Sequence, residues 1–300
     1  MRLDIFKKAI YAAAVILLMS SLAASRLFAQ NADSMMPEQS AAKAKQLLQQ
    51  LITTLGGPAY LGVRETQCDG RRAQFDRLGK ESGFVEFHDY WKYPDHNRLD
   101  MEIRNERGLS MILGDIIPEK TSKASQLYVG DKGWFLDRSG VQEQPEDHLA
   151  EFQRYTRGLA GNILRFHLSD DALTFRYAGT DIADAKEVEW VEITSSDDFT
   201  IRLAIEHSTH LLARTVVIST DQETQQRNED VTIYTNYQWK QGVLTPMQTG
   251  RERNGHRLSQ TFLEDCKYNP VLPADFFTRV ALEKRASQLG IKPNQQKDNH

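Results

Sequence analysis

Cysteine is scarce in this sequence, which contains only Cys68 and Cys266 among its 300 residues. No CxxC pair and no Cys/His cluster is present, which argues against a structural zinc site. A disulfide between the two would tie the first predicted strand region to the last, and an oxidising compartment permits such a bond. Two separate thiols are the alternative, because the sequence does not give the distance between the two Cα atoms.

Catalytic motifs are also missing: the chain has no GxSxG, HExxH, Walker, GxGxxG or EF-hand sequence. His207 and His210 would point to opposite faces of a strand, which is a poor arrangement for metal binding. The acidic pairs at 170–171 and 197–198 are typical of solvated turns. The sequence therefore predicts no metal, no cofactor and no enzyme activity, and leaves a site assembled from distant residues as the alternative.

An excess of positive charge is absent, since the formal net charge is −4. Removal of residues 1–30 would take away four basic residues and one acidic residue, leaving about −7. Such a chain lacks the basic face that nucleic acids require. Charge alone would not hold it on an anionic membrane surface either.

No apolar run reaches the length of about 20 residues that a membrane span needs. The longest run, at 9–24, has 16 residues and follows three basic residues, and small residues come after it. This layout predicts a secretory signal peptide over residues 1–30, cleaved after Ala29, and therefore a periplasmic protein. An uncleaved N-terminal anchor is the alternative.

Two segments of the chain have helical periodicity. The first runs from Pro37 to the glycines at 56–57, with Ala44, Leu48 and Leu51 on one face. The second covers 145–167, where apolar residues recur at intervals of three and four and Pro145 suits the first turn. Both helices are amphipathic and need a surface to cover.

The rest of the chain alternates with the period of two that is typical of half-buried antiparallel strands. "VGDKGWFLDRSG" (129–140) predicts a strand, a tight turn and a second strand, because glycine and aspartate suit the turn. In "KEVEWVEIT" (186–194) the alternation slips, which suggests a bulge. About twelve strands with two helices predict one α+β domain over residues 31–280. Residues 281–300 read as a polar tail that is partly disordered.

Large apolar side chains are expected on the buried face of this sheet. Two helices cover only part of so broad a surface, so the uncovered part could form an apolar cleft that binds a ligand. The alternative is that these side chains only fill the hydrophobic core. Trp134, in the 129–140 hairpin, is expected to pack inward or at the cleft rim. The full set of candidate ligand-binding residues is Phe87, Trp91, Trp134, Phe175, Trp190, Leu203, Ile233, Trp239 and Phe262.

Four features resemble the outer-membrane lipoprotein-sorting proteins, relatives of the periplasmic lipoprotein carrier LolA. They are the signal peptide followed by a helix, the "YVGDKGWFLD" hairpin, the helix directly after it, and the ending "CKYNPVLPADFFTR". In that ending Asn269, Leu272 and the phenylalanines at 276–277 match the family's pattern. The family's functional basic residue has no matching motif around Arg64, Arg71, Arg72, Arg98 or Arg104.

The resemblance implies an incomplete β-barrel of about eleven strands wrapped around two main helices. It also implies an apolar cavity for acyl chains, no cofactor and no catalysis. On this basis the chain is expected to be a monomeric periplasmic carrier that holds a lipid or an acylated lipoprotein, with an inner- or outer-membrane protein as a further candidate partner. An envelope sensor or protein-interaction module on the same scaffold, without lipid cargo, is the alternative function.

Overall fold

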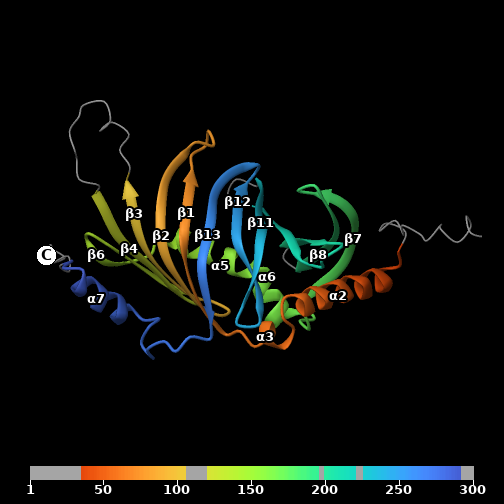
Figure 1. Cartoon of the computed structure of the whole chain (residues 1–300), viewed down its shortest axis with the longest axis horizontal. Coiled ribbons are helices and arrows are strands. Elements are labelled where there is room, and N and C mark those ends of the chain that lie inside the picture. Colours follow the sequence, from red (N-terminus) through yellow and green to blue (C-terminus); the bar gives the residue numbers. More distant parts are fainter. Residues whose placement is uncertain (1–34, 106–119, 196–198, 221–225, 292–300) are drawn as a thin grey trace, which may run out of the picture.

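The computed structural model describes residues 35–105, 120–195, 199–220 and 226–291. One large antiparallel sheet dominates this part of the chain, and short helical segments lie on both of its faces (Figure 1). Residues 1–30, the expected signal peptide, and residues 292–300 of the expected tail lie outside the described residues. Among the helices of the described ranges, none combines the length and the apolar character needed to cross a membrane.

The sheet has thirteen strands in the described residues and is open, with β6 and β7 at its two edges. The expectation of about eleven strands was therefore too low. Its order is β6-β5-β4-β3-β2-β1-β13-β12-β11-β10-β9-β8-β7, and every neighbouring pair is antiparallel. The first six strands are β1 (Glu65–Phe75), β2 (Glu81–Lys92), β3 (His96–Asn105), β4 (Lys120–Val129), β5 (Lys132–Asp137) and β6 (Gly140–Glu143). The other seven are β7 (Leu173–Ala183), β8 (Lys186–Ser195), β9 (Thr200–Glu206), β10 (Leu212–Thr220), β11 (Arg227–Lys240), β12 (Val243–Arg253) and β13 (His256–Tyr268).

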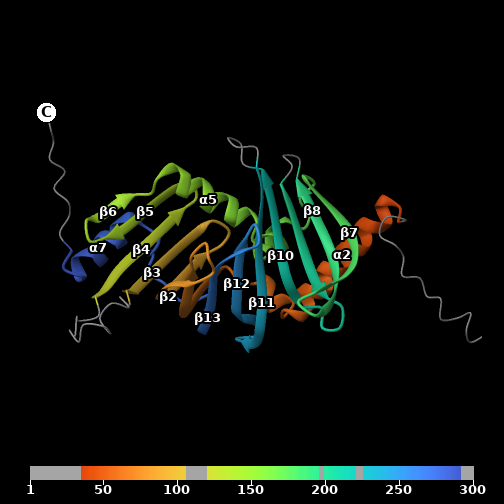
Figure 2. The same ribbon diagram turned by 90° about the horizontal axis from the view of Figure 1, so that it is seen from above.

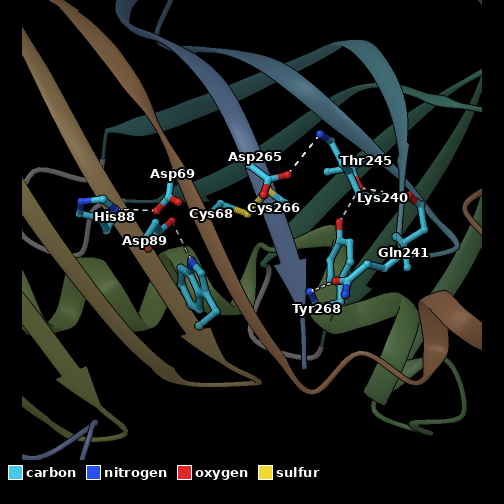
Figure 3. Close-up of a disulfide and its surroundings, with 12 residues drawn as sticks. Cys68, Asp69, His88, Asp89, Lys240, Gln241, Thr245, Asp265, Cys266 and Tyr268 are labelled. Carbon is cyan, nitrogen blue, oxygen red and sulfur yellow. Dashed lines mark hydrogen bonds and ion pairs between the residues drawn. A yellow bond between two sulfur atoms is a disulfide. The ribbon is translucent and has the colours of Figure 1, made fainter. Parts of the chain in front are cut away.

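Two meanders, β1–β6 and β7–β13, make up this sheet and meet where β1 pairs with β13. A disulfide joins Cys68 and Cys266 at this junction, with Cα atoms 4.2 Å apart and directly opposite in the register (Figure 3). One residue further along, the register shifts at Asp69/Gly70. The bond therefore links the two strands at the centre of the sheet, a pairing that the sequence left open.

The hairpin expected at 129–140 is present. β4 and β5 pair on either side of Gly130, whose φ of +59° suits the tight turn. A second turn leads from β5 into β6, where the Asp137 carboxylate accepts from the Ser139 amide at 2.7 Å. The segment is structural in this respect, as its turn residues predicted.

Helix α2 (Pro37–Thr54) is the amphipathic helix expected after Pro37. Its apolar side packs on β7 and β8, and Leu48 and Leu51 are fully buried there. The Ser40 hydroxyl accepts from the Tyr177 amide at 3.0 Å, where β7 loses its regular pairing with β8. A short helix, α3 (Pro58–Leu61), follows and leads into β1.

The helix expected over 145–167 is broken into α5 (Glu146–Arg157), α6 (Ala160–Asn162) and a π-helical turn, η2 (Ile163–His167). The break falls at Leu159, which is extended. Gly158, just before it, lies so close to β10 that a Cβ there would come 2.8 Å from Val217. The chain thereby crosses from the β6 edge toward the other half of the sheet, as Figure 2 shows.

The C-terminal segment differs from the polar tail expected over 281–300. Helix α7 (Arg279–Gln288) packs on β4, β5 and β6, with Leu282 fully buried and Arg285 donating to Ser125 at 3.0 Å. Beneath it, Asp100 accepts from Arg98 at 3.1 Å and lies 3.4 Å from Arg285. The segment reads as polar because only two of its helical residues, Leu282 and Ala286, are buried.

Strand β8 is buried on both faces. Val188 points to one face and Val191 to the other, and both side chains are fully buried. This explains the slipped alternation in "KEVEWVEIT". The β8–β9 register is continuous, so the bulge expected in this segment is absent, and the irregularity lies in the opposite strand between Tyr177 and Thr180. A second apolar cluster thus covers the face of β8–β11 that points away from α2.

Replacing both cysteines by alanine should lower the free energy of unfolding by about 2–4 kcal/mol, because the bond restricts the unfolded chain over a long loop. Urea denaturation followed by far-ultraviolet circular dichroism measures the change. The native spectrum should stay that of the wild type. An unchanged urea midpoint would mean that the β1–β13 hydrogen bonds alone stabilise the junction.

Candidate functional site

The face of the sheet that carries α2, α5, α6 and η2 is called the inner face here, and the face that carries α7 is the outer face. Near α2 the inner face is a sealed aliphatic core, in which Leu48, Leu51 and Leu203 are fully buried. Near the middle of the sheet the composition changes to aromatic and polar side chains. This central inner region, over β1, β2, β12 and β13, is the candidate site.

Three rings attach α5 to the first half of the sheet. Phe152 of α5 stacks on Tyr128 of β4, with centroids 4.1 Å apart and planes at 9°. It also stacks on Trp91 of β2 at 5.9 Å and 18°. This aromatic stack buries most of the apolar surface of α5, and offset stacking adds to the stabilisation from burial.

Ion pairs attach α5 to the second half of the sheet. The Arg253 guanidinium donates to Asp230 at 2.7 Å and to Glu151 of α5 at 3.1 Å. These hydrogen bonds, Asp230 first, raise the pKa of Arg253 and keep it charged. Arg251 lies over the Tyr155 ring at 4.8 Å. Because α5 is fixed on both sides, it forms a roof across the strands between them.

Asp89 is the acidic group of the central inner region and lies opposite Cys68 in the register (Figure 3). Its carboxylate accepts from Asn97 at 2.6 Å and from the Trp91 indole at 3.1 Å. Burial raises the pKa of Asp89, while these hydrogen bonds and the charge of Arg72 act in the opposite direction. Arg72 itself donates to Thr261 at 3.2 Å and lies over Phe87 at 5.1 Å.

Tyrosines surround the rest of the region. Thr245 and Tyr268 share a hydrogen bond of 2.6 Å between their hydroxyls, and Tyr234 lies 3.3 Å from the Thr215 hydroxyl. Burial raises the pKa of Tyr234 and of Tyr268 to about 12, so both are neutral at physiological pH. Burial favours the neutral phenol because it reduces the solvation of the phenolate.

Several side chains beneath the roof keep part of their surface accessible. Asp89, Tyr93, Tyr234 and Tyr268 are only half-buried, in contrast to the sealed core under α2. A cavity of about 250 Å³ lies at the start of β10, beside Tyr234 and Tyr237. Its other lining residues include Lys186, Glu206, Thr209 and Leu212. The inner face is therefore sealed under α2, and partly accessible side chains lie near the middle of the sheet.

The nine residues predicted from sequence do not share one face. Phe87, Trp91, Phe175 and Leu203 lie on the inner face, and the last two belong to the core under α2. Trp134 pairs with Leu127 on the outer face, on the side of α7, so the expected inward position was wrong. Trp190 and Ile233 lie in or against the second apolar cluster. Trp239 and Phe262 are 63% and 40% exposed.

Sequence reasoning missed most residues of the central inner region. Tyr128 and Phe152 are far apart in sequence and meet only because α5 folds across the sheet. Asp89 interrupts the apolar alternation of Val85, Phe87 and Trp91, and this interruption is the one sequence signal that the region is mixed in polarity. Within the described ranges no group of three His, Cys, Asp or Glu residues could hold a metal ion.

No known protein-family profile matches the sequence, and no curated protein matches it. Solved structures do share the fold. A DUF1329 family protein from Desulfovibrio piger superposes with a TM-score of 0.53 at 13% identity, over 81% of this chain and 99% of that one. A domain from Vibrio parahaemolyticus, described as an outer membrane lipoprotein-sorting protein, gives 0.50 at 10% identity, over 81% and 99%.

A LolA superfamily protein from Nitrosomonas europaea is more distant, with a TM-score of 0.45 at 15% identity over 83% of this chain and 100% of that one. The first two matches show that the chain shares the fold of a DUF1329 family protein and of an outer membrane lipoprotein-sorting domain, so the resemblance is confirmed at the level of the fold. Identities this low show the fold alone.

Phe152→Ala should lower the free energy of unfolding by about 3–5 kcal/mol, because it removes the ring shared by two stacked contacts. Gln153→Ala, at an exposed position of the same helix, should change it by less than about 0.5 kcal/mol. Urea denaturation of both variants provides the comparison. Equal effects would contradict the role of the aromatic stack in fixing α5.

The Asp89 carboxyl should titrate above its ordinary pKa of 3.8. The folded state then binds this proton more tightly than the unfolded state, so this group's contribution to stability falls as pH rises from 3.8 through the folded-state pKa. Carbon-13 NMR of the side-chain carboxyls measures the midpoint directly. Arg72→Gln should raise it further, and a wild-type midpoint at or below 3.8 would contradict the assignment.

Proposed function

We propose that this protein is a periplasmic binding or carrier protein that holds a lipid or an acylated ligand in the central inner region, beneath α5. One observation carries the proposal: Trp91, Tyr93, Tyr234 and Tyr268 keep part of their surface accessible, although a helix that stacks on Trp91 crosses this face of the sheet. A folded domain ordinarily seals such surface, as this one does under α2. A partly accessible aromatic region beneath a helix suits a ligand with an apolar chain.

The fold supports the proposal without establishing it. One structure of the same fold is described as an outer membrane lipoprotein-sorting protein. Such a carrier needs neither a cofactor nor a catalytic group, and it would act as a monomer that exchanges cargo with membrane partners.

Location in the periplasm is part of the proposal. Residues 1–30 have the basic start, apolar run and small residues of a secretory signal. Disulfides such as Cys68–Cys266 form and persist in oxidising compartments. On this view the mature domain extends from about residue 31 through α7, which belongs to it because Leu282 is buried against the sheet.

A second candidate is a protein-interaction module on the same scaffold. The exposed side chains of Trp239 and Phe262 favour it, because aromatic residues are enriched in protein–protein interfaces relative to the rest of the protein surface. In that case the interior would hold no cargo.

Native mass spectrometry of protein purified from periplasm, followed by organic extraction, tests the carrier. We expect a bound lipid or acylated peptide. Trp91→Ala should weaken binding of a fluorescent fatty-acid probe by roughly tenfold, since it removes buried apolar contact. Trp239→Ala is the matched control, because the same residue type lies outside the region and is 63% exposed. A clean apo mass with no probe binding would contradict the carrier and favour the interaction module.

A further inference from the structure

Arg165, on η2, occupies an unusual position beneath the roof. Its guanidinium lies over the Tyr60 ring at 4.2 Å and over the Tyr93 ring at 4.8 Å. Its Nε donates to the Tyr60 carbonyl at 3.1 Å and its Nη1 to the Gly161 carbonyl at 3.3 Å. Two carbonyls and two ring faces orient the group, and no carboxylate of the described residues forms an ion pair with it.

The groups around Arg165 do not balance its charge. Tyr60, Tyr93 and Tyr268 interact with it electrostatically, and burial raises the pKa of each, so all three are neutral. Asp89, the acidic group of the same region, interacts electrostatically with Arg72, and burial raises the pKa of Asp89.

A second cation of the central inner region adds to the excess of positive charge. Arg251 lies over Tyr155 and has no ion pair within the part of the chain that the structure describes. The region is therefore electropositive, although the chain as a whole has a net charge of −4.

A partly buried cation without a counter-ion is unfavourable, and an anion placed beside it would be stabilised. Arginine has five N–H donors, and the two hydrogen bonds to carbonyls use two of them, which leaves about three. A planar guanidinium held between ring faces presents these donors along its edge. This edge matches the paired oxygens of a carboxylate or phosphate.

We propose that Arg165 binds the anionic head of the ligand, and that the ligand is an amphiphile with a carboxylate or phosphate group. A neutral lipid of the same chain length would bind more weakly. The inference rests on the proposed carrier function and adds the chemical class of its cargo. The apolar chain would lie along the aromatic residues of the region, Trp91 and Phe152 among them.

A purely structural role is the competing explanation. In that case Arg165 only ties η2 to α3 through the Tyr60 carbonyl, and the charge of a ligand would not matter. The comparison of ligands on the unmodified protein separates the two, because it does not depend on how a variant folds.

Isothermal titration of the full mature protein with oleate, oleyl alcohol and acetate provides that comparison. We expect oleate to bind at least about tenfold more tightly than oleyl alcohol, which is the effect of one charge-assisted interaction. Acetate should not compete at concentrations near those of oleate. Equal binding of oleate and oleyl alcohol would overturn the anion site and leave the carrier in place. If neither oleate nor oleyl alcohol binds, the proposed carrier function is wrong. If acetate competes as well as oleate does, the site binds free anions, and the proposal of an amphiphilic ligand is wrong.

Arg165→Gln should weaken oleate binding by about tenfold and leave oleyl alcohol within about twofold. Arg165→Lys keeps the charge without the planar edge, so it should retain part of the preference for oleate. The matched control is Arg257→Gln, because Arg257 also lies over a ring, Phe75 at 4.2 Å, but at an exposed position. If Arg165→Gln folds, as its thermal unfolding would show, and still prefers oleate as the wild type does, the assignment to Arg165 is wrong.

Discussion

The pairing of β1 with β13 is the constraint on which the rest of the structure depends. It is the only strand pairing that joins the two meanders within the described sheet, and the Cys68–Cys266 bond lies in the middle of it. The strands beneath the central inner region are these two and their neighbours, β2 and β12. Thr66 pairs with Tyr268 across the junction and with Trp91 on the other side. A shift of one residue in this pairing would send the central side chains to the outer face.

The roof follows from the same constraint. The chain leaves the sheet at one edge, β6, and re-enters at the other edge, β7, so the connection must cross the inner face. Its path is set by the aromatic stack on one half and by the Arg253 ion pairs on the other. The break at Leu159 and the close approach at Gly158 let the crossing bend, so η2 brings Arg165 between the Tyr60 and Tyr93 rings.

Polarity divides the inner face into two parts with different physical behaviour. Aliphatic side chains under α2 exclude water and stabilise the fold by burial. Tyrosines and arginines under α5 leave accessible surface, and their hydroxyls and guanidinium groups form hydrogen bonds with nearby partners. Specificity for a ligand would therefore come from the polar groups, while affinity for an apolar chain would come from the rings. The outer face of β4–β6 is covered by α7, so the inner face is the one left with a partly open region.

The sequence by itself determined the local features of this protein. Period-two alternation, glycine at the 129–140 turn and the apolar stripe after Pro37 all act within one element, so they identify strands, a hairpin and α2 correctly. The order of these elements predicted an α+β domain, and the resemblance of four segments to the lipoprotein-sorting proteins predicted the shared fold. What the tertiary structure decided is which face of the sheet each side chain meets. Alternation fixes only that the side chains of Trp134 and Phe135 point to opposite faces of the sheet. The packing of α7 decides that the face of Trp134 is the outer one. Likewise, Tyr60, Tyr93 and Arg165 come together only through long-range packing, since three separate elements contribute them. Contacts between residues far apart in the chain leave no periodic trace in the sequence, which is why the core under α2 could be anticipated and the charged aromatic region beneath α5 could not.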